Sequence, residues 1–363
     1  MYKLIKKIAK KIFYFLQSFL YRIEKIDLLI NQKLHLNDYV DQNIKHSKIN
    51  VIDLGCYGDV PDYWKKYKCI NFYGFDIDTI EINRQKKKYN NTGKYNFFNF
   101  RITEPQNLEK FKELYRSHYY DKNFYTQRTV QAYEHEKKKN YNDQQSIINY
   151  NLVSVDIPSI TIGEIITTNL VPKDINFLKI DIDSNDHEVL YGADKLIDKK
   201  ELFGIQIEVD FVKNKNSNSF RDFTEVTRYL QSKKMVLCNL STSNYSSNDL
   251  PIKYLHSFPG PNLYGCPLMG DMIFFKHLND EYLKSLNTDQ IIKLLRLLEI
   301  FNMNHLAIEV LNNIKFSNNE GIFLIFRNLL IKKFEQKNFF NFNNYKKYIQ
   351  NYKLDKDKFL NIL

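Results

Sequence analysis

Short apolar runs alternate with stretches of helical character between residues 49 and 277, and this alternation most limits the fold of the chain. The runs are rich in β-branched and aromatic residues, which favour strands. Strands that alternate with helices predict an α/β fold, a mostly parallel sheet with helices on both faces. The strands are expected at 49–55, 71–78, 95–102, early in 153–166, and at 175–183, 202–211, 235–240 and 270–277.

The 363 residues are enough for one large domain or two, and 43% hydrophobic residues are typical of a globular protein. We expect an N-terminal helix and connector over 1–48, then the α/β domain over 49–278 with an insertion at 103–150. Residues 279–363 are read as an α-helical extension, with two of its helices joined at 302–304. For this extension we favour packing, or formation of a homo-oligomer, over catalysis.

The chain has 53 basic and 42 acidic residues, a net charge of +11. The lysine runs 86–88 and 137–139 are interpreted as solvated faces, and no basic, aromatic-lined groove for nucleic acid is evident. The four cysteines lie far apart, which argues against a zinc site or a disulfide framework and fits the cytoplasm. They are Cys56, Cys69, Cys238 and Cys266.

Residues 1–30 combine five early lysines with apolar residues every three or four positions, which predicts an amphipathic helix. The uncharged stretch 12–21 is too short to span a bilayer, and no signal-peptide cleavage site follows it. Two alternatives stay open. The helix packs on its own domain, or it lies on the inner face of an anionic membrane as a peripheral contact.

Glycines and acids follow the first two predicted strands. Asp53 ends the first strand, Gly55 and Gly58 follow it, and Asp76 comes 21 residues after Gly55, near the spacing of an acid that binds ribose hydroxyls. The third glycine of a dinucleotide motif is missing, which suits S-adenosylmethionine, a cofactor without a pyrophosphate. Asp78 is interpreted as a solvated or more distant acid. The expected cofactor-binding residues are Asp53, Gly55, Cys56, Tyr57, Gly58, Asp76 and Ile77.

A second group of acids follows the strand at 175–183. A carboxylate that ends a buried strand needs a partner, so Asp181 is a candidate catalytic residue, as is Asp183, which lies on the same face. His187 is a candidate base unless it points outward. Structural alternatives are a capping box for Glu188 and a helix-dipole role for Asp186.

The next strand ends in two further acids, Glu208 and Asp210, which we expect to contact the acceptor. Together with Asp181 and Asp183 they provide the hard oxygen ligands that Mg²⁺ or Ca²⁺ takes. A divalent metal on Asp181, Asp183 and Glu208 is therefore an alternative, but it is not favoured.

Four segments resemble the FkbM-type methyltransferases: VIDLGCYGD, FYGFDID, INFLKIDIDSNDHEVLYGA and GIQIEVDF. The resemblance covers about 49–277 and departs from the family at Asp183-Ser184, where the family usually has Glu-Gly. It implies a Rossmann-like class I fold with a seven-stranded sheet. It also implies an S-adenosylmethionine-dependent O-methyltransferase, with a small-molecule or glycan hydroxyl as acceptor.

Two other functions remain as alternatives. One is a non-catalytic binding or scaffold module in a glycan assembly complex. The other, a nucleic-acid methyltransferase, is disfavoured because 181–184 reads Asp-Ile-Asp-Ser rather than the Asn/Asp-Pro-Pro-Tyr/Phe element that base methylation usually employs. The loop 256–271 is interpreted either as a rim of the acceptor pocket or as an ordinary connection.

Overall fold

The computed structural model describes residues 48–90, 93–107, 157–182, 186–211, 222–245 and 266–313, together with Arg327. The chain divides into two compact units, one over Lys48–Leu294 and the other made of Met1–Ser47 with Leu295–Leu363. The first unit contains every described strand. The predicted helix at 1–30, Asp183 and nearly all of the insertion lie outside the described residues.

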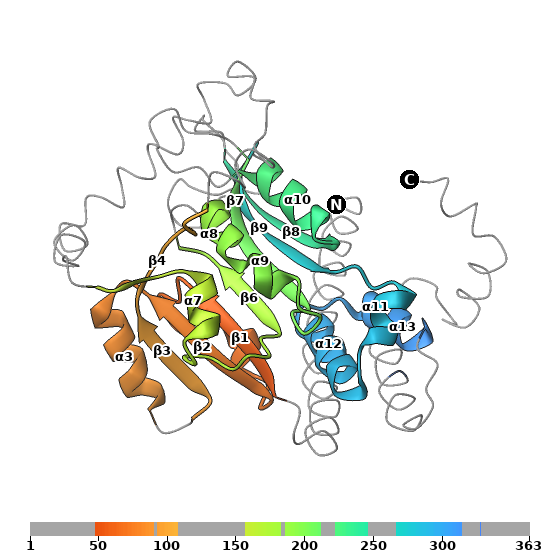
Figure 1. Ribbon diagram of the computed structural model, residues 1–363, viewed down its shortest axis with the longest axis horizontal. Helices are drawn as coiled ribbons and strands as arrows, with labels where there is room; N and C mark the ends of the chain where they lie inside the picture. The colour runs from red at the N-terminus through yellow and green to blue at the C-terminus, as the bar shows by residue number, and fades with distance from the viewer. Residues whose placement is uncertain are drawn as a thin grey trace, which may run out of the picture. The chain divides into compact units, whose positions relative to one another are not determined.

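A seven-stranded sheet with the order β3-β2-β1-β6-β7-β9-β8 forms the centre of the first unit (Figure 1). All its strands are parallel except β9, which runs antiparallel to β7 and β8. The order reverses between β1 and β6, where ligands bind in open α/β sheets. The predicted Rossmann-like fold is thus confirmed. The strands are β1 (Ile49–Leu54), β2 (Ile70–Asp76), β3 (Tyr95–Asn99), β6 (Phe177–Ile180), β7 (Gly204–Asp210), β8 (Met235–Tyr245) and β9 (Cys266–Lys276).

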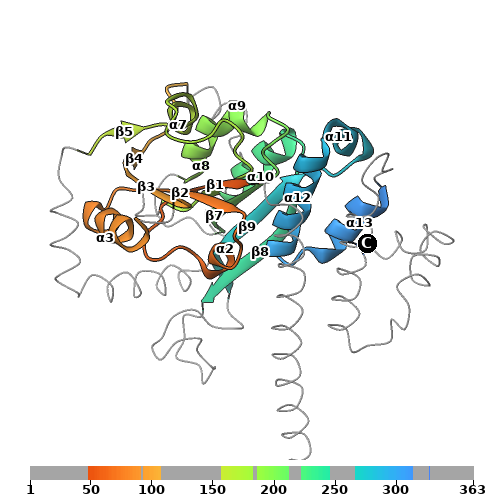
Figure 2. The same ribbon diagram turned by 90° about the horizontal axis from the view of Figure 1, so that it is seen from below.

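Helices cover both faces of this sheet (Figure 2). On one side lie α2 (Asp62–Lys65) and α3 (Thr79–Tyr89). The other side carries α7 (Ile162–Thr167), α8 (Asp186–Leu190), a 3-10 helix (Tyr191–Ala193), α9 (Asp194–Ile197) and α10 (Phe223–Ser232). Three helices follow the sheet: α11 (Asp280–Ser285), α12 (Thr288–Ile300) and α13 (Asn304–Asn313).

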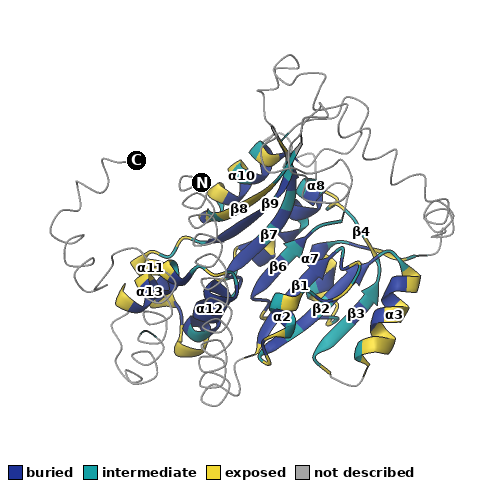
Figure 3. Cartoon of the chain, turned by 180° about the vertical axis from the view of Figure 1, so that it is seen from behind, coloured by how far each residue is buried: buried dark blue, intermediate teal, exposed yellow. Residues whose placement is uncertain are grey.

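Residues alternate between the two faces of each central strand, because successive side chains of a strand point in opposite directions. In β6, Leu178 and Ile180 join the large apolar cluster under α7–α10, whereas Lys179 faces the α2 side. In β1, Ile52 and Leu54 likewise join that cluster. Figure 3 shows how thoroughly these central strands are buried. Charged side chains therefore gather on the α2 side, toward the carboxyl ends of the strands.

Several predicted strands have different limits in the structure: β6 is shorter than 175–183, and β8 extends to Tyr245 rather than ending at 240. The run 95–102 breaks at Phe100, because the side-chain amide of Asn99 donates to the carbonyls of Asp76 and Ile77, both at 3.0 Å. The chain then turns into β4 (Arg101–Ile102), which pairs with β5 (Ser159–Ile160) in a separate small sheet. The last strand begins at Cys266 rather than 270, so the end of the 256–271 loop is strand. Pro267 fits there because it lies at a register shift opposite Asn244.

The described part of the C-terminal region is helical, as predicted. Helices α12 and α13 meet at the expected break, where Asn302 has a φ of 60°. Within the second unit, Arg296 and Glu299 form a buried pair at 2.7 Å. No helix among the described residues has the length and apolar character needed to cross a membrane.

Candidate functional site

The loop after β1 passes so close to the end of β6 that only glycine fits at its first position. Gly55 has a φ of 83°, and a Cβ built on it would lie 1.7 Å from the carbonyl oxygen of Asp181. Gly58 has a φ of 90° but open space around it. The loop is therefore pressed against the switch point of the sheet, with its far end open to a ligand.

Side chains of α3 hold this loop in place. The amide of Gln85 donates to the carbonyls of Cys56 at 2.7 Å and Gly58 at 2.5 Å. Glu81 accepts the Gly58 N–H at 3.1 Å, and Arg84 donates to the Gly58 carbonyl at 2.9 Å. Sequence reasoning missed these three residues, because a pattern of helical polar residues does not say which loop they contact. These bonds hold the loop backbone, which lowers the entropic cost of binding a ligand.

Asp76 ends β2 beside the loop, where a ribose-binding acid was predicted. Its side chain is 8% exposed, and its Oδ1 accepts the Asp78 N–H at 2.8 Å. Burial raises the pKa of this carboxyl. Asp78 instead caps α3, because its carboxylate accepts the N–H groups of Ile80 and Glu81. Of the two acids, Asp76 is thus the one available to a ligand.

A buried ion cluster joins β1 and β6. The Lys179 ammonium lies 3.3 Å from Oδ1 of Asp53 and 3.0 Å from Oδ2 of Asp181. Asp53 is 1% exposed, and burial raises its pKa to about 6 although Lys179 acts in the opposite direction. Burial alone would lower the pKa of Lys179, but its two carboxylate partners raise it above the usual value. The lysine therefore stays charged and holds the two strand ends together.

The raised pKa of Asp53 predicts a pH dependence of stability. Between about pH 4 and pH 6 the folded protein holds a proton on Asp53 that the unfolded chain has released. The stability from this group is complete below pH 4 and declines as the pH rises through 6. In urea unfolding, the wild type should therefore lose stability relative to Asp53→Asn over this interval. Parallel pH profiles of the two proteins would contradict the prediction.

The predicted acceptor-binding acids continue this charged row along β7. Lys179 pairs in register with Gln206, so Glu208 and Asp210, at alternate positions, lie on the same face. Opposite Glu208 on β9 is Asp271, which accepts from Gln206 at 3.3 Å. Sequence reasoning did not identify Asp271, because only the antiparallel pairing of β9 brings it there.

The candidate residues of α8 do not join this row of charged side chains. Asp186 is fully buried and its Oδ1 accepts the Ile182 N–H at 2.7 Å, so its carboxylate joins the end of the β6 segment to the start of α8, a structural role. His187 Nε2 lies 3.9 Å from a carboxylate oxygen of Glu225 on α10, a helix of the opposite face from α2. Glu188 is half-buried on α8, and its proposed capping partner Asn185 lies outside the described residues. The structure thus brings Asp53, Asp181 and Glu208 to one face, and His187 toward another.

No group of three or more His, Cys, Asp or Glu in the described ranges is arranged to hold a metal ion. The one cation among the described side chains of the β1–β6 cluster is Lys179. Six carboxylates lie on or beside the same face: Asp53, Asp76, Asp181, Glu208, Asp210 and Asp271. An excess of negative charge of this kind suits a cationic ligand.

Residues 58–236 match the family model described as the methyltransferase FkbM domain. This match places residues 58–236 among the FkbM methyltransferase domains. This match confirms the family predicted from the four sequence segments.

Similar solved structures include methyltransferases. The 16S rRNA methylase ArmA is 12% identical, with 68% of this chain and 85% of that chain covered and a TM-score of 0.26. The bifunctional kinase-methyltransferase WbdD is 11% identical, with 70% and 39% covered and a TM-score of 0.26. An uncharacterized protein from Listeria monocytogenes serotype 4b is 7% identical, with 83% and 98% covered and a TM-score of 0.29. These TM-scores are too low to define the fold, which rests on the strand order. No curated protein matches the chain.

Proposed function

We propose that this protein transfers a methyl group from S-adenosylmethionine to a hydroxyl group of a sugar or glycan. The observation that carries the cofactor assignment is the glycine loop, pressed on Asp181 at the switch point beside the buried Asp76. The sugar acceptor rests on the family resemblance. We place the activity in the cytoplasm, with homo-oligomers and a peripheral membrane contact through residues 1–30 as further proposals.

The residues around the loop fit the cofactor. Asp76 would accept hydrogen bonds from the ribose hydroxyls, and the backbone of 55–58, with Tyr57 72% exposed, would approach the amino-acid end and the sulfur. Ile77 would contact the base. Asp53 would act through Lys179, because it is too buried to meet a ligand itself. The row of carboxylates favours the positive charge of the sulfonium and the amino group.

The bound cofactor supplies a methyl group on a cationic sulfur, so the protein has to align the acceptor and accept a proton. The residues of this chain would place the acceptor oxygen in line with that methyl group, and Asp181 would accept the proton that the hydroxyl releases. Lys179, 3.0 Å from Oδ2 of Asp181, fixes that carboxylate. Glu208 and Asp210 would bind the acceptor hydroxyls. Asp183 and His187 remain proposed catalytic residues, with His187 requiring a different side-chain direction to reach the site.

Asp76→Asn tests the cofactor site. The variant keeps an oxygen for the Asp78 N–H but removes the charge that strengthens bonds to the ribose, about 1.5–3 kcal/mol. Calorimetric titration should therefore show at least tenfold weaker binding of S-adenosylmethionine and S-adenosylhomocysteine. Asp62→Asn, on the surface of α2, serves as the matched control and should bind like the wild type. If the folded wild type binds neither compound, the proposed methyltransferase activity is refuted and a scaffold role is favoured.

The acceptor is tested separately, with radiolabelled S-adenosylmethionine and a panel of sugars, glycans, RNA and DNA. The proposal predicts alkali-stable label in a sugar fraction and none in nucleic acid. If label appears in RNA or DNA alone, the sugar acceptor is wrong and the acceptor is a nucleic acid, whereas the proposed cofactor site still holds.

A further inference from the structure

At the end of the sheet opposite the glycine loop, a pocket of about 480 Å³ opens where β8 begins and β9 ends, which is the amino-terminal end of β7. This volume is in the range of small-molecule sites. Its lining residues come from the segment after α9, the end of α10, β9 and α11, and they include Lys200, Lys233, Lys234, Lys276, His277 and Tyr282.

The pocket is positively charged, since its lining contains four lysines against two carboxylates, Asp198 and Glu281. Lys233 is neutralised at its rim by Asp194 at 2.7 Å and Asp198 at 3.0 Å. Lys200 donates to the carbonyl of Ser285 at 3.0 Å. Lys200 and Lys233, each with a partner in the protein, therefore form two opposite walls of the pocket.

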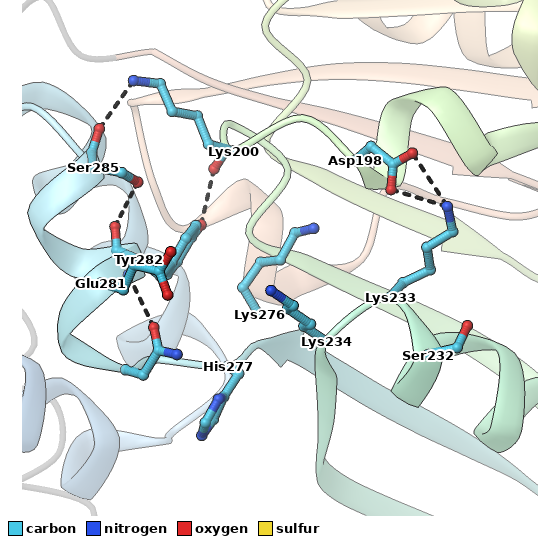
Figure 4. A pocket seen from close by; sticks show the side chains of 11 residues that line it. Asp198, Lys200, Ser232, Lys233, Lys234, Lys276, His277, Glu281, Tyr282 and Ser285 are labelled. Atoms are coloured by element: carbon cyan, nitrogen blue, oxygen red, sulfur yellow. Dashed lines mark hydrogen bonds and ion pairs between the residues drawn. The ribbon is translucent and has the colours of Figure 1, made fainter.

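The other two lysines lie between these walls (Figure 4). Lys276 is half-buried and donates to the carbonyl of Ile197, and Lys234 is exposed. Among the described residues, neither forms a close ion pair with a carboxylate, and Asp198 acts on Lys276 only from a greater distance. Burial lowers the pKa of Lys276, a sign that its charge lacks full compensation. An anion between the walls would supply that compensation.

We infer that this pocket binds a small molecule through a phosphate group held by Lys276 and Lys234. A dianion matches two adjacent ammonium groups, and lysine is a common phosphate ligand. The volume exceeds that of a phosphate alone. The organic part of the ligand would therefore extend toward His277 and the ring of Tyr282, whose hydroxyl is fixed by a bond to the Lys200 carbonyl at 2.9 Å. The site is separate from the proposed cofactor site and stands whether or not that assignment holds.

Calorimetric titration at constant ionic strength tests the site, with inorganic phosphate and ribose 5-phosphate as probes. We expect saturable binding of phosphate with a Kd on the order of 1 mM, and binding of the monoester at least as tight. Lys234→Gln/Lys276→Gln should weaken both by at least about tenfold. Lys234→Gln alone, at an exposed position, should weaken both about threefold and keeps the test valid if the Lys276 change unfolds the protein.

The matched control is Lys86→Gln/Lys87→Gln, which removes the same charge from the exposed surface of α3. It should bind within twofold of the wild type. Absence of saturable phosphate binding to the wild type, or an equal loss in the control, would overturn the site. If ribose 5-phosphate binds more than tenfold more weakly than phosphate, the inference that the ligand has an organic part is wrong.

Discussion

Gly55→Ala is expected to lower the free energy of unfolding by more than about 3 kcal/mol and to abolish cofactor binding. A left-handed backbone costs a non-glycine residue about 1–2 kcal/mol, and a forced steric overlap adds about 1–3 kcal/mol. The overlap here is severe, because the new Cβ would lie 1.7 Å from the backbone oxygen of Asp181, which cannot rotate away. Urea unfolding and calorimetry with S-adenosylhomocysteine measure the two losses.

Gly58→Ala is the matched control for this prediction. Gly58 has a similar φ of 90°, but a Cβ there meets no atom within 4 Å. It should therefore show only the backbone cost of about 1–2 kcal/mol. Equal destabilisation by the two variants would mean that the close approach of Gly55 to β6 is not what requires glycine.

Lys179→Met is expected to destabilise the protein by about 3–5 kcal/mol, because it leaves Asp53 buried without its cation and removes a partner of Asp181. The loss should shrink on acidification, since a protonated Asp53 carries no charge to neutralise. The deficit is measured by urea unfolding at pH 7 and pH 5.

A double variant separates the ion pair from simple packing. Asp53→Asn/Lys179→Met removes both charges, so its stability should exceed that of Lys179→Met alone at pH 7. Lys86→Met, on the exposed side of α3, should change stability little. A double variant less stable than Lys179→Met would show that the lysine acts through its packing rather than through its charge.

Much of the sheet was predictable because its strands are rich in β-branched and aromatic residues. In 202–211, apolar residues alternate with Gln206, Glu208 and Asp210, which is the period of a strand with one buried face. The break at Phe100 was not predictable, because it depends on Asn99 bonding to a neighbouring strand. The early start of β9 was missed because Pro267 argues against a strand unless the register shift is known.

At the site, local spacing identified Gly55, Gly58 and Asp76, which the structure places at one switch point. The same reasoning could not identify the residues that form ion pairs and hydrogen bonds at the site. Lys179 was recognised only as part of a family motif, although a lysine inside the apolar run FLKI signals a buried ion pair. His187 was proposed as a base because it is the one histidine in the acidic group that follows β6, but it belongs to α8 and its side chain lies toward Glu225 of α10.

The position of β9 also sets an order of events during synthesis. The strand inserts between β7 and β8, although both precede it in the chain. Until residues 266–276 have left the ribosome, β7 presents an open edge and β8 has no neighbour in the sheet. Such edges bind other chains readily, and long-range pairing is slow. The nascent protein therefore passes through a period of vulnerability to aggregation, which ends for β7 only when β9 pairs with it.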